Sequence, residues 1–345
     1  MKSGWTIKKL SEIADFNPRE SLQKGTIAKK VGMDKLQPFC RDIPSFEMEL
    51  FTGGTKFRNG DTIMARITPC LENGKTAKVD ILEEDEIGFG STEYIVFRAK
   101  EGVDEDFLYY LICSSVVREP AIKSMVGSSG RQRVQTDVIQ NLDIMVPTYE
   151  EQCLIGGVLR NFDDKIKISK LINKNLEQQA QAIFKSWFID FEPFSNRKPS
   201  DWSVSTLGNV SIMGAGGDKP QNVSSIKTDL YEYPIYSNGL SNEGLYGFTD
   251  KPKISEESVT VSARGTIGFV CLRHIPYVPI VRLVTLIPKT EITSAKYLYL
   301  WLKQLHITGT GTTQQQLTVP DFQKTEILGP PQEIMTLFTA TVEPI

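Results

Sequence analysis

The sequence predicts an α+β protein in which two homologous globular domains with β-rich cores are separated by a long coiled-coil helix. Three observations lead to this fold class: the length of 345 residues, an internal repeat, and a proline-free segment with heptad spacing. A chain of this length is too long for one ordinary domain, and two domains of roughly 150 residues with a connector are expected. Hydrophobic residues at 40% and charged residues at 23% are typical of soluble globular proteins.

The repeat opens each half with a tryptophan motif. Trp5 precedes Leu10, and Trp202 precedes Leu207 at the same spacing. Apolar residues also stand two and eight positions after each tryptophan, which is typical of a short strand that leads into a helical turn. Four more pairs of segments follow in the same order: 63–66 with 261–264, 107–111 with 297–301, 127–134 with 308–317, and 142–147 with 325–330. This common order indicates a duplication, and the divergent middle of each half is expected if the two domains bind different targets.

The repeat and its connector predict five segments. A proline ends the last strand of each domain, Pro147 in the first half and Pro330 in the second, and precedes a helix start. The segments are the first domain at 1–149, a spacer helix at 150–192, a linker at 193–200, the second domain at 201–330, and the start of a second helix at 331–345, which we expect to be truncated.

The connector is predicted to be one long helix. Residues 150–191 contain no proline, and apolar residues recur in alternating steps of four and three, interrupted by Ser169 and Asn173. A helix over this segment spans on the order of 60 Å and needs a partner along its apolar seam to be stable in water. The predicted helix interface consists of Ile155, Leu159, Phe162, Ile166, Leu176, Ile183 and Trp187.

Cysteine and histidine usage argues against disulfides and metal sites. The five cysteines include no CxxC pair, and the two histidines, His274 and His306, lie outside any ligand-like cluster. A reducing cytoplasm is therefore the expected location. No apolar run is long enough for a membrane span, and the first ten residues do not resemble a signal peptide.

The overall charge does not indicate a nucleic-acid-binding protein. The 39 Lys and Arg residues against 42 Asp and Glu residues give a net charge of −3. A DNA-binding role would therefore require that basic groups gather on one face or that partners supply part of the positive field.

The order of these motifs resembles that of the specificity subunits of type I restriction–modification enzymes. The resemblance is carried by the openings at Trp5 and Trp202 and by the helix end at 182–191. It also rests on three further segments: the Gly/Gln-rich loops at 127–135 and 308–318, and the proline-led helix start at 146–152. The resemblance covers essentially the whole chain; each motif alone is loose, but their order and spacing are specific.

This resemblance implies a function and partners. Each globular domain would be a target recognition domain that reads one half of a split site in double-stranded DNA. The helices would fix the distance between the halves and bind two methyltransferase subunits, and a restriction subunit would join them. The chain itself would have no catalytic site and no cofactor, because S-adenosylmethionine would be bound by the methyltransferase subunits.

The short second helix is a departure from the family pattern. Family members usually carry a full second helix packed antiparallel on the first, whereas the counterpart of 162–191 is missing after residue 345. We hypothesise that two copies pair helix against helix to form a homodimer. The alternative is that another subunit covers the seam.

Residues that suit DNA contact lie in the paired loops. Arginine reads guanine, and glutamine or asparagine reads adenine, whereas Lys, hydroxyls and backbone amides contact phosphates. Arg66 and Arg264 occupy matching places in the repeat, although a structural ion pair is the rival role, as a solvated turn is for the loops. Lys75 and Lys78 follow a turn signal and are expected near a loop tip. The candidate DNA-binding residues are Arg66, Lys75, Lys78, Ser128, Arg131, Gln132, Arg133, Arg264, Thr312, Gln314 and Gln315, with Asn222, Asn238, Asn242 and Tyr246 as unranked additions.

Two other functions compete with DNA recognition. A two-domain protein–protein adaptor that dimerises through the long helix fits the lack of overall basic charge. An autonomous enzyme is disfavoured, because the sequence shows neither a methyltransferase motif nor a nuclease constellation. Salt dependence separates DNA binding from the adaptor, since DNA binding weakens steeply as salt rises.

Overall fold

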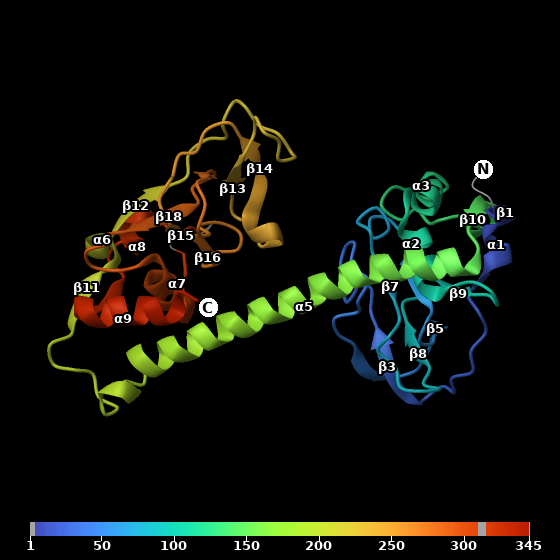
Figure 1. The fold of residues 1–345 in the computed structure, drawn as a ribbon, viewed down its shortest axis with the longest axis horizontal. Coiled ribbons are helices and arrows are strands. Elements are labelled where there is room, and N and C mark those ends of the chain that lie inside the picture. The colour runs from blue at the N-terminus through green and yellow to red at the C-terminus, as the bar shows by residue number, and fades with distance from the viewer. Residues whose placement is uncertain (1–3, 310–314, 345) are drawn as a thin grey trace. The chain divides into compact units, whose positions relative to one another are not determined.

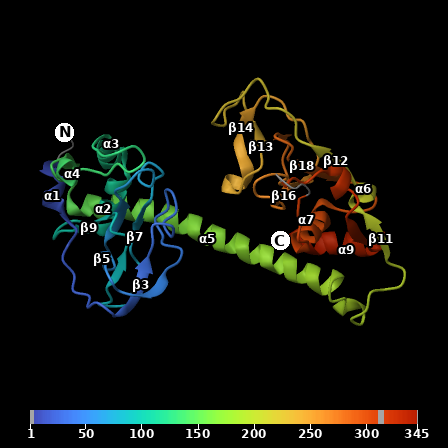
Figure 2. The same ribbon diagram turned by 180° about the vertical axis from the view of Figure 1, so that it is seen from behind.

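A computed structural model describes residues 4–309 and 315–344 (Figures 1 and 2). The chain divides into two compact units, Met1–Lys170 and Leu171–Ile345, which we call unit 1 and unit 2. The longest helix, α5 (Tyr149–Phe188), contributes its first half to unit 1 and its second half to unit 2. None of the described helices is long and apolar enough to cross a membrane.

Unit 1 is closed by its own first and last strands. Strand β1 (Thr6–Lys9) pairs antiparallel with β10 (Asp143–Val146), and the helical turn α1 (Leu10–Ile13) follows β1. A first sheet has the order β2-β9-β6-β7, and a second has the order β4-β3-β8-β5, in which β3 and β8 run parallel. The remaining elements are β2 (Ala14–Phe16), β3 (Ile27–Val31), β4 (Glu47–Leu50), β5 (Thr55–Phe57), β6 (Thr62–Ala65), β7 (Thr76–Lys78), β8 (Gly88–Gly90), β9 (Tyr94–Ala99), α2 (Glu105–Cys113), α3 (Ser115–Lys123) and α4 (Thr136–Gln140).

Unit 2 repeats this plan. Strand β11 (Ser203–Thr206) pairs antiparallel with β19 (Glu326–Gly329), and α6 (Leu207–Val210) follows β11. A four-stranded sheet has the order β12-β18-β15-β16, and a three-stranded sheet has the order β14-β13-β17, in which β13 and β17 run parallel. The remaining elements are the 3₁₀ turns η1 (Glu192–Phe194) and η2 (Ser241–Gly244), β12 (Ser211–Ala215), β13 (Tyr233–Tyr236), β14 (Leu245–Thr249), β15 (Ser258–Val261), β16 (Val270–Arg273), β17 (Val278–Pro279), β18 (Val284–Pro288), α7 (Ala295–Gln304), α8 (Val319–Phe322) and α9 (Gln332–Val342).

The repeat in the sequence is therefore a repeat of structure. Leu10 and Leu207, which follow the two tryptophans at equal spacing, are fully buried in the cores of their units. The turn that each leucine begins forms a helix of one turn directly after the closing strand, in both α1 and α6. The predicted fold class, with two homologous β-rich domains and a long helix between them in the sequence, is confirmed.

Helix α5 begins at Tyr149, one residue before the predicted start of the spacer. The Thr148 hydroxyl accepts a hydrogen bond from the Glu151 amide at 3.4 Å, and the Glu151 carboxylate accepts one from the Thr148 amide at 3.2 Å. These reciprocal bonds form a capping box, which satisfies backbone donors that an unpartnered helix end leaves free. The helix ends at Phe188, and Phe191, at a φ of 55°, turns the chain into η1.

In unit 1, α5 crosses α2 at close range and is held by polar side chains. A Cβ at Gly156 would lie 2.7 Å from the Phe107 amide nitrogen, so only glycine permits this approach. One turn after Gly156, Arg160 of α5 forms an ion pair with the Asp106 carboxylate at 3.0 Å. One turn further on, the Tyr110 hydroxyl donates to the Asp163 carboxylate at 2.6 Å. The attachment of α5 to unit 1 therefore depends on buried and half-buried charges.

In unit 2, aromatic packing holds the last turns of α5. Phe184 and Phe188 of α5 are almost fully buried and contact rings from α7 and α9. The ring centroid of Phe188 lies 4.9 Å from that of Tyr297 and 4.8 Å from that of Phe338, both in edge-to-face geometry. Such pairs add about 0.5–1.5 kcal/mol each beyond the area they bury. Trp202 joins the same cluster, with its ring centroid 4.9 Å from that of Phe194.

The predicted helix interface is covered only in part. Ile183 and Trp187 pack against the core of unit 2, and Leu176 is half-buried there. Phe162 and Ile166 are 62% and 52% exposed, and Leu154 and Val158 extend this apolar stripe outside the predicted set. Ile155 is half-buried, and Leu159 is exposed. The first half of the seam thus presents an apolar face, which we call the α5 stripe (Leu154, Val158, Phe162 and Ile166).

We predict that Asp106→Asn destabilises unit 1 and changes its response to pH. Burial alone would raise the pKa of Asp106, but the hydrogen bond from Lys78 and the charges of Lys78 and Arg41 hold the pKa below its usual value. A carboxylate with a lowered pKa stabilises the fold above its unfolded-state pKa of about 3.9, and this contribution is lost as the pH falls through the folded-state value. The substitution should lower the free energy of unfolding by about 2–3 kcal/mol near neutral pH, because Lys78 and Arg41 lose their anion.

Denaturant unfolding between pH 7 and pH 3 measures this effect. The loss of stability on acidification should be smaller in Asp106→Asn than in the unchanged protein. Glu101→Gln, at an exposed turn, is the matched control and should change neither the stability nor its pH dependence. An Asp106→Asn variant with unchanged stability at pH 7 would contradict the role given to this carboxylate.

Candidate nucleic-acid interface

The Gly/Gln-rich loop of unit 1 is an exposed hairpin. Val126 and Arg133 pair through two backbone hydrogen bonds of 3.0 and 2.9 Å, and the tip between them is exposed. Gly127 and Gly130 adopt φ values of 135° and 76°, which favour glycine. Ser128 and Arg131 stand at the tip, where their polar groups face solvent.

The structure brings this hairpin and Arg66 together around one carboxylate. Arg133 donates to both oxygens of Glu93 at 2.6–3.0 Å, and the Arg66 Nε lies 3.8 Å from the same carboxylate. The Gln132 carbonyl accepts a hydrogen bond from the Thr68 amide at 3.0 Å, which fixes the hairpin beside the end of β6. The hydrogen bond from Arg133 lowers the pKa of Glu93, so this carboxyl is ionised at neutral pH.

Arg66 forms an ion pair with Glu93, which is the structural role that the sequence left open as the alternative to DNA contact. The side chains of Arg66 and Arg133 nevertheless remain 32% and 42% exposed. A carboxylate behind a guanidinium fixes its plane and leaves other N–H groups for a second acceptor. No sequence motif marks Glu93, because it stands in an ordinary turn before β9.

The expectation of a loop-tip position is wrong for Lys78. This lysine ends strand β7, its side chain is only 9% exposed, and its ammonium lies 2.6 Å from Asp106. Lys78 is therefore a buried partner of Asp106 and leaves the set of candidate DNA contacts. Lys75 does precede β7 at the turn, but its ammonium donates to the Met33 carbonyl at 2.8 Å.

Unit 2 also places Arg264 beside its own loop, with the backbone contact one residue earlier than in unit 1. The Leu317 amide donates to the Ala263 carbonyl at 3.0 Å, as the Val134 amide donates to the Arg66 carbonyl at 2.9 Å in unit 1. The exposed Arg264 guanidinium donates to the Gln316 side-chain oxygen at 2.8 and 3.1 Å. Gln315 is exposed, whereas Thr312 and Gln314 lie outside the described residues. A neutral amide orients this arginine, so its positive charge is not compensated there.

Among the additional candidates in unit 2, two are structural. Asn238 uses both ends of its amide, accepting from the Ala263 amide and donating to the Val281 carbonyl, each at 2.7 Å. Asn222 donates to the Asp250 carboxylate at 2.9 Å. Asn242 and Tyr246 are exposed, and they stay predicted readers of the second half-site.

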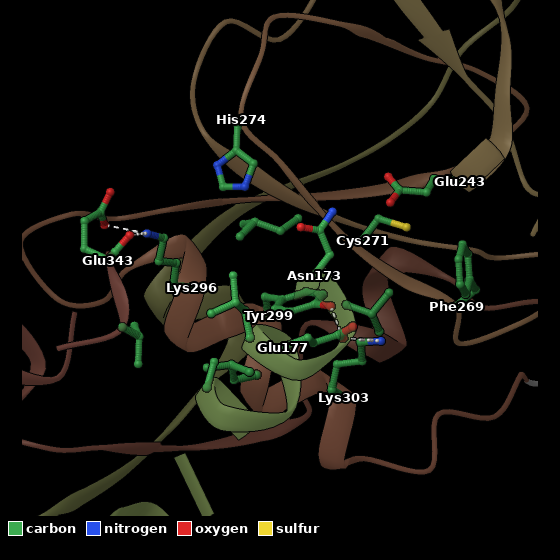
Figure 3. Close-up of a pocket in the computed structure, with 16 residues that line it drawn as sticks. Asn173, Glu177, Glu243, Phe269, Cys271, His274, Lys296, Tyr299, Lys303 and Glu343 are labelled. Carbon is green, nitrogen blue, oxygen red and sulfur yellow. Dashed lines mark hydrogen bonds and ion pairs between the residues drawn. The ribbon is translucent and has the colours of Figure 1, made fainter. Parts of the chain in front are cut away.

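A cavity of about 760 Å³ lies within unit 2 between α5, α7 and β16 (Figure 3). Four of its charged groups are paired with one another. Glu177 accepts from the Tyr299 hydroxyl at 2.6 Å and from Lys303 at 3.1 Å, and Lys296 pairs with Glu343 at 2.6 Å. The hydrogen bond from Tyr299, followed by the interactions with Lys303, lowers the pKa of Glu177. This network stabilises the packing of α5 on α7.

Reactive groups in the described residues are few. Burial raises the pKa of Cys271, in the same cavity, to about 11, so its thiol is protonated and a poor nucleophile at neutral pH. The residues that the structure describes contain no group of three or more His, Cys, Asp or Glu side chains placed to hold a metal ion.

Comparison with known protein families identifies the family. The model described as the type I restriction modification DNA specificity domain matches residues 2–178 and 199–336. The two matched segments contain both closing strand pairs and both arginine–loop arrangements. The chain therefore belongs to the family of type I restriction–modification DNA specificity proteins.

Individual relatives agree with this assignment. The chain is 27% identical over 274 residues to a type I restriction enzyme specificity subunit of Methanocaldococcus jannaschii, covering 71% of this chain and 63% of that protein. It is 24% identical over 371 residues to the HindI specificity subunit of Haemophilus influenzae, covering 83% and 80%. A type I specificity subunit of Mycoplasma pneumoniae is 29% identical over 251 residues, covering 72% of this chain and 66% of that protein. The chain thus spans just under two thirds of the M. jannaschii and M. pneumoniae relatives.

A solved structure shares the fold. The type I restriction–modification system S subunit from M. genitalium superposes with a TM-score of 0.59 at 15% sequence identity, covering 99% of this chain and 91% of that one.

We predict that Tyr299→Phe weakens the attachment of α5 in unit 2. Loss of the hydrogen bond to an ionised partner should lower the free energy of unfolding by about 1–2 kcal/mol and raise the pKa of Glu177 towards its ordinary value. Thermal unfolding and NMR titration of the Glu177 carboxyl measure the two effects. Tyr246→Phe, at an exposed tyrosine of the same unit, should change neither quantity; an unshifted Glu177 pKa in Tyr299→Phe would argue against the network.

Proposed function

We propose that this chain is the DNA-reading subunit of a type I restriction–modification complex, in which it recognises a bipartite site and directs methyltransferase and restriction subunits to it. This proposal rests on one observation: each unit has an arginine beside a Gly/Gln-rich loop. The pairs are Arg66 with the loop 127–135 in unit 1 and Arg264 with the loop 308–318 in unit 2. One such arrangement per unit matches one half-site per unit.

The chemistry of the two arrangements supports base and phosphate contact. A guanidinium whose plane is fixed by a neighbouring acceptor is suited to the paired O6 and N7 acceptors of guanine. Glycines in the loop tips let backbone amides approach a phosphate. Unit 1 carries a compensating carboxylate at Glu93, whereas Gln316 leaves the Arg264 charge available. Because the chain has a net charge of −3, the methyltransferase subunits would supply part of the positive field.

Catalysis belongs to the partners in this proposal. S-adenosylmethionine would be bound by the methyltransferase subunits, and this chain would contribute no reacting group. All five cysteines are free thiols in the structure, which is consistent with a reducing cytoplasm. The chain would therefore meet its DNA and its partners in the cytoplasm.

The α5 stripe supports a helical partner. Apolar residues at positions four apart lie on one face of α5, and such a face is stabilised when a second helix packs on it. We propose that a second copy of α5 covers it in the free protein and that the methyltransferase subunits bind the helix in the assembled complex.

Methylated DNA tests the function directly. The chain would be expressed with the methyltransferase subunit encoded beside it, and the methylated sites would be read by single-molecule sequencing. A split motif is expected. Replacing 308–318 by Gly/Ser should abolish recognition of one half, and replacing 127–135, the matched variant, should abolish recognition of the other. A methylated motif that stays whole after both replacements would refute the assignment of the loops, and the absence of any complex or motif would favour the adaptor.

We predict that Arg264→Ala lowers the affinity for the methylated duplex by about 10-fold to 100-fold and relaxes one base position, because a bidentate base contact contributes about 1–3 kcal/mol. Lys324→Ala, which removes an exposed lysine of the same unit, is the control. Fluorescence anisotropy at several salt concentrations measures both. An unchanged motif with unchanged affinity in Arg264→Ala would exclude a base contact.

We predict that the free protein is a dimer through the α5 stripe. Light scattering at micromolar concentration should give twice the chain mass, and Phe162→Asp or Ile166→Asp should convert it to a monomer, because a buried carboxylate would lack a partner. Lys174→Asp, at an exposed position on another face of α5, should remain dimeric. A monomeric mass for the unchanged protein would rule out the homodimer.

A further inference from the structure

An exposed turn in unit 2 holds two consecutive non-glycine residues in the left-handed region. Val281 has a φ of 51° and Arg282 a φ of 60°, and both are exposed, Val281 by 47%. This conformation is uncommon for any L-residue and an outlier for a β-branched one. Such strain persists only where the surroundings over-determine it, and it concentrates at sites that contact ligands.

Four hydrogen bonds fix this turn. The Val281 amide donates to the Gly217 carbonyl and the Arg282 amide to the Gly216 carbonyl, both at 2.9 Å. The Gly216 amide donates to the Leu283 carbonyl at 2.8 Å, and the Asn238 side chain donates to the Val281 carbonyl at 2.7 Å. A Cβ at Gly216 would lie 2.7 Å from the Ile280 amide nitrogen, so glycine is required for this close approach.

The Asn238 side chain also connects this turn to the arginine–loop arrangement of unit 2. The Asn238 oxygen accepts the Ala263 amide at 2.7 Å, while its nitrogen donates to Val281. One side-chain amide thus connects the residue before Arg264 to the residue before Arg282. Arg264 and Arg282 therefore belong to backbone segments that lie next to each other.

Positive charge gathers around the turn. Arg264 and Arg282 are exposed, and among the described residues neither has an ion pair. Lys219 is exposed near Gly216 and Gly217, and the Lys253 ammonium would lie 3.7 Å from a Cβ at Gly217. Asp218, the acidic residue between Gly217 and Lys219 in the sequence, is also exposed. The cluster is a local basic surface on a chain whose overall charge is −3.

We propose that the turn at 281–282 is a second DNA-contact element of unit 2, in which Arg282 binds a phosphate of double-stranded DNA beside the base contacted by Arg264. Asn238 is a positioning residue that couples the two. The phosphate contact fixes the register in which Arg264 meets its base, since phosphate contacts position a protein on the duplex and base contacts specify the sequence. This inference rests on the proposed DNA-reading function.

Salt-dependent binding of Arg282→Gln tests the phosphate contact. The full chain, in complex with its methyltransferase subunits, would be titrated with the duplex that carries its methylated motif and with an unrelated duplex. Removing one phosphate contact should lower affinity for both duplexes by a similar factor and reduce the slope of log K against log salt by about one. The methylated motif should stay the same. Lys289→Gln, at the other end of strand β18, is the matched control and should change neither affinity nor slope.

The outcomes of these titrations distinguish failure of the Arg282 phosphate contact from failure of the proposed DNA-reading function. If the unchanged complex binds its motif while Arg282→Gln keeps the full salt slope and affinity, the phosphate contact is wrong. If Arg282→Gln relaxes one base of the motif, Arg282 reads a base, and the proposal is again wrong. If the unchanged complex neither binds nor methylates a split motif, the proposed function itself has failed.

Two further variants test strain and positioning. Val281→Gly should keep or raise the melting temperature while lowering DNA affinity, because glycine relieves the unfavourable φ but leaves the turn free to move. Asn238→Ala should lower affinity for the motif more than Arg282→Gln does and relax the base read by Arg264, when measured on the folded protein. A lower melting temperature with unchanged affinity and motif in either variant would show a purely structural role.

Discussion

The carboxylate of Asp106 is the constraint on which unit 1 depends. It is almost fully buried and lies within 2.6–3.3 Å of three cations, Lys78 on β7, Arg41 in a loop, and Arg160 on α5. Each of these charges would be costly to bury alone, and together they satisfy one another. Because the three partners come from a sheet, a loop and the long helix, one side chain fixes the sheet and α5 relative to α2.

The two halves of α5 are attached by different physical means. In unit 1 the contacts described are ion pairs and charged hydrogen bonds at Asp106 and Asp163, whereas in unit 2 the rings around Phe184 and Phe188 are added to the charged contacts of Glu177. Charge pairs demand exact geometry and respond to pH and salt, and aromatic packing depends on the area removed from water. Between these attachments, residues 165–175 are exposed, and Lys167 pairs with Asp42 of unit 1 at 3.1 Å.

The architecture could be predicted from the sequence because local motifs and periodic patterns determine it. The tryptophan openings, the proline-led helix start and the heptad spacing each need only a short window, and the repeat compares one window with another. The candidate site was predicted less completely. Arg66 and Arg264 were found through the repeat, whereas Glu93 was missed and Asn238 was named only as a base reader. Both are joined to their partners by long-range contacts that no local pattern encodes.

The error at Lys78 has the same origin. The turn signal before it is genuine, since Gly74 adopts a φ of 72°, but the chain enters strand β7 immediately afterwards. Whether a lysine in a short strand faces solvent depends on what packs on that strand, here Asp106 of α2. The strained turn at 281–282 is also invisible in the sequence, because valine and arginine carry no preference for the left-handed region.

Each unit is closed by a pairing between its own first and last strands, β1 with β10 and β11 with β19. The arginine–loop arrangement of each unit lies between those two strands in the sequence, and the closing pair is built in the same way in both halves. A genetic exchange with breakpoints just inside the closing strands would therefore replace one such arrangement and leave α5 unchanged. Under the proposed function, new combinations of half-sites would arise by recombination of whole units rather than by stepwise mutation of contacts.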